Sequence, residues 1–308
     1  LDEISLDLYG GEILGVAGIA GSGQKELCEA LAGLYPVQSG AIIYHRRDQR
    51  GQVISEDVAG LPPMEFIRRG IAMSFVPEDR LGMGLVAAMD MTDNVMLRSY
   101  YRNKGLFVDR KTPRALAEQL IEQLEIITPG VDTPVRLLSG GNVQKVLLGR
   151  EIASAPQVLI VAYPVRGLDI NSSYTIYNLL NQQKLRGVAV LFIGEDLDVL
   201  LEICDRILVI CGGSVSGIVD ARKVSKEQLG LMMTQRSDGG SCVVPGLLAT
   251  GPQPMKAQSC APAQAEGEIP ATPSGNGGSS AAAGPDAPYT PAAAPADAKG
   301  EGGAADDA

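Results

Sequence analysis

Eight residues in the middle of the chain, Leu138 to Lys145, read LSGGNVQK, and an apolar, helix-compatible run follows them. A serine and two glycines at the start of a helix leave backbone N–H groups free at the positive end of the helix dipole. Such a helix start holds an anion with no side chain in the way. Taken alone, Ser139-Gly140-Gly141 is better explained by a serine-capped helix after a flexible turn. The rest of the chain must decide between these two interpretations.

A second glycine-rich segment lies near the start of the chain. Residues 13–17 form a short apolar run, which is typical of a buried parallel strand. The loop from Gly18 to Gly23 follows, and a helical pattern then runs to about Gly33. The order of strand, glycine loop and helix is that of a nucleotide-binding βα unit.

Strand and helix patterns alternate through the first 235 residues, which predicts an α/β fold. Apolar or alternating runs predict further strands at 4–8, 41–44, 71–76, 158–162, 188–193, 207–210 and 215–219. The polar segment 46–57 is assigned to neither kind of element.

Helices are expected at 62–70, 116–124 and 174–185. Ser225 with Gln228 has the spacing of a capping box for a last helix. Residues 78–135 carry no strand pattern, so we expect an all-helical insertion over about 78–138.

Composition limits the possible partners and metals. The net charge is −10 at pH 7, and without a basic run no nucleic-acid partner is expected. The five cysteines form no C-x-x-C pair, and the single histidine, His45, cannot complete a zinc site, so buried free thiols are expected. No apolar run reaches the ~18 residues that span a bilayer, and no secretion signal is visible.

After about Gln235, alanine, proline, glycine and serine dominate the chain up to Ala308. Such a segment buries too little apolar surface to offset the entropy cost of ordering it. We therefore expect one folded domain over residues 1–235 and a disordered Ala/Pro/Gly-rich tail over 236–308. Because Leu1 lies inside an apparent strand, we also expect that the first strand of the domain is missing.

The string LSGGNVQK resembles the signature motif of ATP-binding-cassette (ABC) ATPases, in the wording typical of simple-sugar and nucleoside importers. The resemblance covers roughly residues 1–235. It implies a P-loop NTPase core with an all-helical signature subdomain, and ATP with Mg²⁺ as cofactors. It also implies that signature residues complete the ATP site of a partner cassette. These residues are Leu138, Ser139, Gly140, Gly141, Asn142 and Gln144.

The loop from Gly18 to Gly23 has Walker A spacing, after which the family has a lysine for the phosphates and a Ser or Thr for Mg²⁺. Gln24 and Lys25 occupy those places here, and Glu26 follows. Glycine N–H groups alone can cradle phosphate, but Lys25 is turned about 100° around the helix. We expect phosphate binding with weak or absent Mg²⁺, and a strand-turn-helix without any ligand is the alternative. The residues concerned are Gly18, Gly21, Ser22, Gly23, Gln24, Lys25 and Glu26.

The strand predicted at 158–162 matches the Walker B strand. The family pattern ends there with an Asp for Mg²⁺ and a Glu that polarises the attacking water. Ala162 and Tyr163 stand in those two places, so both carboxylates are missing.

Three further positions of the resemblance fall in predicted loops. Glu78, in the string PEDR, takes the place of the Q-loop glutamine, and a solvated turn explains it about as well. Glu195 takes the place of the switch histidine. Gly167, Leu168 and Asp169 match the D-loop, and Asp169 also suits the N-cap of the next helix.

The resemblance implies the second, C-terminal and degenerate cassette of a tandem importer ATPase. No catalytic residue is then expected in this half, and it alone should hydrolyse ATP negligibly. Its partners would be the first cassette of the same or a partner chain, transmembrane permease subunits and, indirectly, a substrate-binding protein. It would lie peripherally on the cytoplasmic face of the plasma (inner) membrane.

Two other classes of function were weighed. A soluble regulatory or structural cassette that binds nucleotide without transport is the main alternative. An independent P-loop kinase is disfavoured, because neither the phosphate-binding lysine nor a Walker B carboxylate is in place. Specificity for the transported substrate would lie in the permease and the substrate-binding protein.

Overall fold

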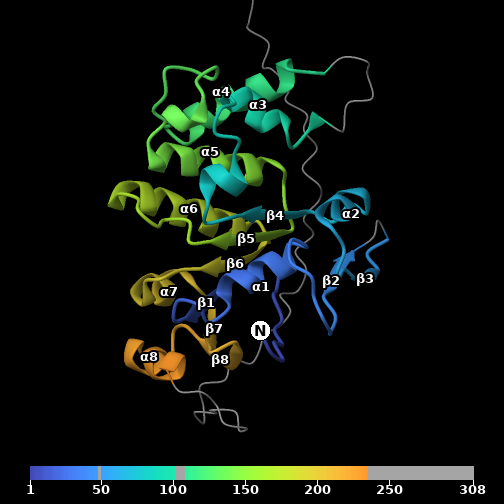
Figure 1. Cartoon of the computed structure of the whole chain (residues 1–308), viewed down its shortest axis with the longest axis vertical. Coiled ribbons are helices and arrows are strands. Elements are labelled where there is room, and N and C mark those ends of the chain that lie inside the picture. The colour runs from blue at the N-terminus through green and yellow to red at the C-terminus, as the bar shows by residue number, and fades with distance from the viewer. Residues whose placement is uncertain (48–49, 101–107, 235–308) are drawn as a thin grey trace, which may run out of the picture. The chain divides into compact units, whose positions relative to one another are not determined.

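The computed structural model describes residues 1–47, 50–100 and 108–234. All of them belong to the first of two compact units, Leu1–Pro254, and the second unit, Met255–Ala308, lies outside the described residues. They form a six-stranded sheet in the order β4-β5-β6-β1-β7-β8 and a separate two-stranded sheet, β2-β3 (Figure 1). The strands of the larger sheet are β1 (Ile13–Gly18), β4 (Met73–Val76), β5 (Val158–Ala162), β6 (Ala189–Ile193), β7 (Arg206–Cys211) and β8 (Ser214–Asp220).

The helices alternate with these strands along the chain. They are α1 (Gln24–Leu31), α2 (Pro63–Arg68), α3 (Met91–Met96), α4 (Lys111–Gln123), α5 (Gly140–Ala153), α6 (Ile170–Leu185), α7 (Leu197–Ile203) and α8 (Lys226–Thr234). A π-helical turn, η1 (Arg80–Gly84), and a 3₁₀ turn, η3 (Val135–Leu137), complete the set among the described residues. None of the helices in the described part combines the length and apolar character needed to cross a bilayer.

Five strands of the larger sheet run parallel, and β8 pairs antiparallel with β7. The carboxyl ends of parallel strands lie at one edge of a sheet, so the loops that follow β4, β5, β6 and β1 meet there. In register, Val76 at the end of β4 lies opposite Val161 of β5, and Ala162 lies opposite Ile193 of β6. Ligands of open α/β sheets bind at this edge.

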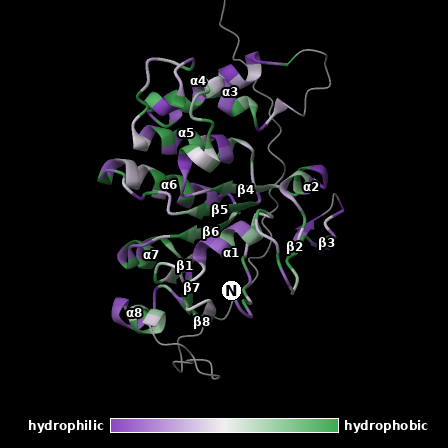
Figure 2. Ribbon diagram, viewed as in Figure 1, coloured by the Kyte–Doolittle hydropathy of each residue, from purple (hydrophilic) through white to green (hydrophobic). Residues whose placement is uncertain are grey.

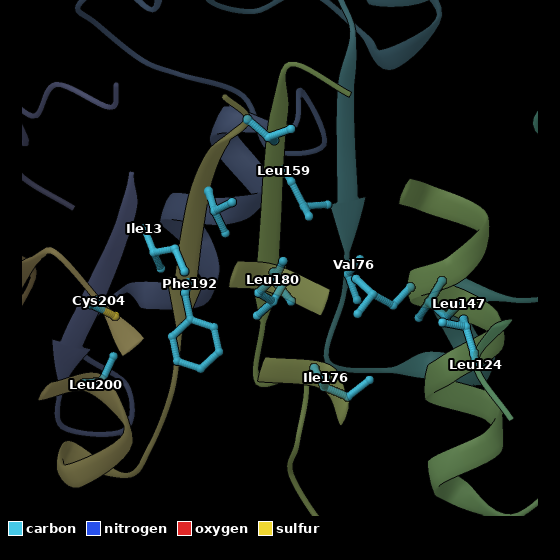
Figure 3. Packing of buried hydrophobic residues seen from close by; sticks show 14 of the residues in the cluster. Ile13, Val76, Leu124, Leu147, Leu159, Ile176, Leu180, Phe192, Leu200 and Cys204 are labelled. Atoms are coloured by element: carbon cyan, nitrogen blue, oxygen red, sulfur yellow. The ribbon is translucent and has the colours of Figure 1, made fainter. Parts of the chain in front are cut away.

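Two hydrophobic clusters cover the two faces of the sheet. Alternate strand residues such as Leu159 and Phe192 pack with residues of α4 to α8 on one face (Figure 3). The other alternate residues, such as Ile160 and Ile193, pack with Leu27 and other residues of α1. Strands β5 and β6 therefore consist of apolar residues on both faces, and Figure 2 colours them mostly as hydrophobic. This is the pattern expected of parallel strands covered on both sides.

The described residues between β4 and α5 form no strand: they form η1, α3, α4 and η3, with one isolated β-bridge between Asp90 and Pro134. In Figure 1, α3 and α4 lie together beyond α5. A Cβ added at Gly149 of α5 would come within 2.9 Å of Leu120 in α4 and within 2.7 Å of Leu124, which follows α4 directly. A glycine at this position therefore lets α4 pack closely on α5. In the described residues, the expected α/β core with a helical insertion is confirmed.

The structure corrects two strand predictions. Residues 4–8 lie in no strand, although Ile4, Leu6 and Leu8 are half-buried against the α1 face of the sheet. The predicted strand at 41–44 begins only at Ile43 and continues as β2 (Ile43–Arg47), which pairs antiparallel with β3 (Val53–Asp57).

Strand β3 lies inside the polar segment 46–57 that received no assignment. Its apolar positions are few, because cross-strand polar pairs hold this hairpin together; for example, Arg46 Nη2 lies 2.8 Å from Glu56 Oε1. The other predicted strands and helices are confirmed to within a few residues at their ends. The tail predicted for 236–308 lies outside the described residues.

Candidate functional site

The glycine-rich loop follows β1 and leads directly into α1. Gly21 and Gly23 have positive φ angles of 83° and 110°, a backbone region that favours glycine. Gly23 is the N-cap residue of α1, and no side chain caps this helix start. The N–H groups of its first turn have no acceptor within the helix, so they are available to an anion.

The residues after the loop differ in burial. Gln24 is only 3% exposed, and its Nε2 donates to the carbonyl oxygen of Ile19 within the loop at 3.1 Å. Lys25 and Glu26 are exposed, and Lys25 Nζ lies 3.8 Å from Glu29 Oε1 on the next turn. The neutral amide of Gln24 thus lies beside the glycine loop, while the Lys25 ammonium pairs with Glu29 on the next turn of α1.

Three charged side chains meet at the carboxyl ends of three adjacent strands. Glu78 follows β4, Arg166 follows β5 and Glu195 follows β6. Arg166 Nη1 donates to Glu78 Oε1, and its Nε lies 3.3 Å from Glu195 Oε1. The two carboxylates raise the pKa of the Arg166 guanidinium, with the Glu78 hydrogen bond as the largest cause. We call these three side chains the Arg166 bridge.

A tight turn after β5 directs Arg166 toward its partners. Tyr163 adopts a left-handed backbone with φ 49°, and its carbonyl accepts from the Arg166 N–H at 3.3 Å. The Arg166 carbonyl in turn accepts from the Arg80 guanidinium of η1. A left-handed tyrosine costs on the order of 1 kcal/mol relative to a right-handed one, so surrounding contacts hold this turn in place.

Tyr163 itself stays neutral in this environment. Burial, followed by the negative charges of Glu78 and Glu195, raises the pKa of its hydroxyl. Ala162 before it is buried and carries no ligand atom. The end of β5 therefore offers no carboxylate to a metal or a water molecule.

A cavity of about 220 Å³ lies between α1 and the ends of β4 and β5. It is lined by Lys25, Cys28, Glu29, Phe75, Pro77, Glu78, Asp79, Met83, Ala162 and Tyr163. Three of these side chains are carboxylates and one is an ammonium, so the lining is negatively charged. The cavity joins predicted positions from three motifs: Lys25 after the glycine loop, Ala162 and Tyr163 after β5, and Glu78 after β4.

The stretch LSGGNVQK begins α5. Ser139 is its N-cap residue, and Ser139 Oγ accepts from the Asn142 N–H at 3.4 Å and from Asn142 Nδ2 at 3.0 Å. Ser139 and Gly140 are exposed and Gly141 is half-exposed. The N–H groups of both glycines belong to the first helical turn, which leaves them without intrahelical acceptors.

The start of α5 lies against the start of α6. A Cβ added at Gly141 would come within 2.6 Å of Ser172 Oγ and 3.7 Å of Asp169 Oδ2. Asp169 is the N-cap of α6, where it accepts from the Ser172 N–H at 2.9 Å and from Ser172 Oγ at 2.7 Å. The N-cap predicted for Asp169 is therefore confirmed, and the close approach explains why Gly141 lacks a side chain.

Other residues of the signature stretch face inward. Leu138 is half-buried against the core, and Asn142 exchanges hydrogen bonds with the backbone of Ile127. Gln144 is fully buried, and among the described residues neither of its amide atoms has a hydrogen-bond partner. These residues support the helix start from within.

The sequence places Arg166 only as the first residue of the D-loop match, and the structure places it at the centre of this edge. The sequence signal for this cluster was the charge pattern of three loops. The loop after β5 carries an arginine, and the loops after the neighbouring strands β4 and β6 each carry a glutamate. His45 lies elsewhere, in β2, where its exposed ring lies 2.8 Å from Ser55 Oγ. Glu78, Tyr163 and Glu195 are brought together, while Gly140 and Gly141 lie at the start of another helix.

Residues 1–164 match the family model described as ABC transporter. This match covers more than half of the chain. The chain belongs to the ABC transporter family.

Curated relatives of this ABC chain carry import names. The nucleoside import ATP-binding protein NupA of Lactococcus lactis is 39% identical over 236 residues, which are 75% of this chain and 44% of that protein. The ribose import ATP-binding protein RbsA 1 of Rubrobacter xylanophilus is 35% identical over 77% of this chain and 46% of its own length. The guanosine import ATP-binding protein NupO of Bacillus subtilis is 35% identical over 77% and 46%. The chain spans about half the length of these curated relatives.

Solved structures show the same fold. A dimeric bacterial ABC transporter cassette superposes with a TM-score of 0.58 at 21% identity, covering 71% of this chain and 89% of that one. A nucleotide-free ATP-binding cassette of an ABC transporter superposes with a TM-score of 0.56 at 20% identity, covering 76% and 88%. At these identities the likeness shows the ABC fold alone.

ABC ATPase cassettes bind ATP and Mg²⁺, and the two ligands fit this chain differently. The glycine loop suits phosphate, because its positive-φ glycines open into an uncapped helix start. Magnesium takes hard oxygen ligands, and at the places of its hydroxyl and carboxylate ligands the chain has Lys25 and Ala162. Among the described residues, no group of three or more His, Cys, Asp or Glu side chains is placed to hold a metal ion. Lys25 and Ala162 therefore offer no side-chain oxygen to Mg²⁺.

Proposed function

We propose that this chain is the second, degenerate cassette of an ABC importer's ATP-binding protein. Its signature segment would complete the ATP site of the first cassette, in the same or a partner chain. Its own glycine loop would form a second site that holds nucleotide phosphates without hydrolysing them. The chain's length, about half that of the curated relatives, is consistent with one cassette of two.

One asymmetry carries this proposal. The signature helix presents an exposed Ser139 and the first-turn N–H groups of Gly140 and Gly141, which have no intrahelical acceptor. Ser139 Oγ accepts from Asn142, so its own proton remains available to an outside acceptor. At the local site, in contrast, the hydroxyl and both carboxylates of the family pattern are replaced by Lys25, Ala162 and Tyr163. A chain with these features can contribute donors to a partner's site but lacks the chemistry for its own.

The proposed site in trans works by positioning and by charge. Three donors, the Ser139 hydroxyl and the two glycine N–H groups, would face the terminal phosphate that the partner's glycine loop holds. Preorganised donors of this kind stabilise developing negative charge without reorganising during the reaction. Asp169 and Ser172, which lie against Gly141, would keep the helix start in position at the interface.

The partners follow from the same proposal. Transmembrane permease subunits would bind the cassette pair on the cytoplasmic face of the plasma (inner) membrane, and a substrate-binding protein would deliver the cargo to them. The relatives' names, which specify import of nucleoside, ribose and guanosine, support nucleosides or simple sugars as cargo. They do not favour the alternative of a regulatory or structural cassette without transport.

The test is Ser139→Arg in the assembled two-cassette protein. A bulky side chain at the helix start blocks closure and displaces the donors, and loss of even one such donor costs about 10²–10³ in rate. We expect ATP turnover of the assembly to fall by at least this factor. The matched control is Ser225→Arg, because Ser225 is an exposed serine that caps α8 through Gln228. It loses a cap without touching the signature, so turnover should persist.

A second variant separates the two sites. Gln24→Lys restores one group of the local site but none of the missing carboxylates, so we expect unchanged assembly turnover. If Ser139→Arg leaves turnover intact while Gln24→Lys raises it strongly, the proposed roles of the two sites are wrong.

A further inference from the structure

The Arg166 bridge occupies the edge of the sheet where the family pattern has its metal ligands. Glu78 holds the Q-loop position and Glu195 the switch position, and both carboxylates bind the same guanidinium. Tyr163, in the place of the water-polarising Glu, lies in the same cluster. Burial and then the charges of both glutamates raise the pKa of its hydroxyl. The Arg166 guanidinium thus links the loops after β4, β5 and β6.

We propose that the guanidinium of Arg166 stands in for the magnesium ion at the local site. This site then binds nucleotide without a divalent metal and prefers a nucleoside diphosphate to a nucleoside triphosphate. The inference rests on the proposed function in one respect, which is that the glycine loop holds phosphate.

The replacement follows from the kind of ligands present. A divalent metal at this edge needs oxygen ligands that are free to coordinate it. The carboxylates at the Q-loop and switch positions, Glu78 and Glu195, are already hydrogen-bonded or ion-paired to Arg166. A planar guanidinium satisfies two carboxylates at once and cannot lose its proton. A metal would have to displace it from both.

The preference for a nucleoside diphosphate over a triphosphate follows from the charge of the site. The glycine loop supplies neutral N–H groups, which donate hydrogen bonds to the inner phosphates without a cation. Beyond them the Arg166 bridge carries two negative charges and one positive charge. The cavity lining adds Glu29 and Asp79, while its one ammonium, Lys25, is paired with Glu29. A terminal phosphate without bound metal adds negative charge to a cluster that is already negative.

The test is a calorimetric titration of the nucleotide-free full chain with ADP and with ATP, each in excess magnesium and in excess EDTA. We expect ADP to bind at least about tenfold more tightly than ATP, and magnesium to change the ADP affinity by less than about twofold. Tighter binding of magnesium-ATP than of ADP overturns the inference. Failure of both nucleotides to bind also overturns it, while the trans role of Ser139 stands on its own test.

Variants of the Arg166 bridge sharpen the outcome. Glu78→Gln with Glu195→Gln removes both negative charges, so ATP affinity should rise at least about tenfold relative to ADP. Arg166→Gln frees both carboxylates for a hard cation, so nucleotide binding should become magnesium-dependent. An unchanged ATP-to-ADP ratio in the double variant contradicts the charge argument, whatever the affinity of the native chain.

A matched control tests whether the loss of any exposed arginine–carboxylate ion pair changes nucleotide binding in the same way. Arg114 of α4 is exposed and binds Asp132 through two hydrogen bonds of 2.8 and 2.9 Å. It lies in the helical insertion, outside the cavity lining. Arg114→Gln should leave both the nucleotide preference and the response to magnesium unchanged. A change equal to that of Arg166→Gln overturns the assignment to Arg166.

Discussion

Arg206 at the start of β7 holds Glu12, directly before β1, by two hydrogen bonds of 2.7 and 3.0 Å. The two side chains are only 9% and 4% exposed. Glu12 also accepts from the Tyr9 N–H at 2.8 Å, and the guanidinium lies 4.9 Å from the centre of the Tyr9 ring. The pair therefore fastens the segment before β1 to the neighbouring strand, at the opposite end of β1 from the glycine loop.

Removing one partner of this ion pair should destabilise the domain. Arg206→Ala leaves the Glu12 carboxylate buried without its cation, which typically costs 3–5 kcal/mol, so we expect a loss of about that size in the free energy of unfolding. Chemical denaturation monitored by circular dichroism measures it. Replacing both partners, as in Glu12→Leu with Arg206→Met, should recover most of the loss. A single variant as stable as the double variant contradicts the argument.

The described cysteines should differ in reactivity. Burial is the main cause that raises the pKa of Cys28 and of Cys204, so both stay protonated and inert at pH 8. Cys211 is partly exposed. With Cys242 and Cys260 replaced by serine, iodoacetamide should label Cys211 at least about tenfold faster than the other two, as peptide mass spectrometry would show. Labelling of Cys28 at the rate of Cys211 would mean that the cavity beside α1 opens widely.

Stability in acid should depend on Asp169. Hydrogen bonds from the hydroxyl and the N–H of Ser172 lower the pKa of this carboxyl below its ordinary value. A lowered pKa stabilises the fold above the ordinary value of about 3.9, and this contribution is lost as the pH falls through the lowered pKa. Asp169→Asn keeps the cap but not the charge. Melting temperatures of the two proteins should converge as the pH falls below 4, and a constant difference would contradict this assignment.

The chain alone should release phosphate from ATP negligibly. The resemblance assigns Lys25, Ala162, Tyr163 and Glu195 to the positions that normally hold Mg²⁺, polarise water and supply the switch histidine, and groups that act as a unit are not restored one at a time. A phosphate-release assay on contaminant-free protein measures this. Turnover in the usual enzyme range of ~1–10³ per second would refute the degenerate site.

The elements with strong periodicity were predictable from the chain, and those held by polar pairs were not. β5 and β6 are continuous apolar runs because both faces of the sheet are covered, and they lie within a residue of their predicted ends. The capping box at Ser225 was predictable because its hydrogen bonds connect residues three positions apart. β3 was missed because its stability comes from cross-strand pairs, which no local pattern records.

By itself the sequence determined which chemical groups are present and which are absent. Residue type and spacing alone give the signature motif around Ser139. They also show that Ala162 and Tyr163 carry no carboxylate. The family followed from the resemblance of the signature motif, and the fold class followed from the alternation of strand and helix patterns along the chain.

Only the tertiary structure decided which of these groups meet. Arg166 binds Glu78 because β4 and β5 are neighbours in the sheet although the whole helical insertion separates them in the chain. The left-handed turn at Tyr163 then directs the guanidinium to both glutamates. Gly141 is confined in the same way by Ser172 of another helix. Strand order and turn geometry depend on packing of distant segments, so local sequence patterns do not reveal these contacts.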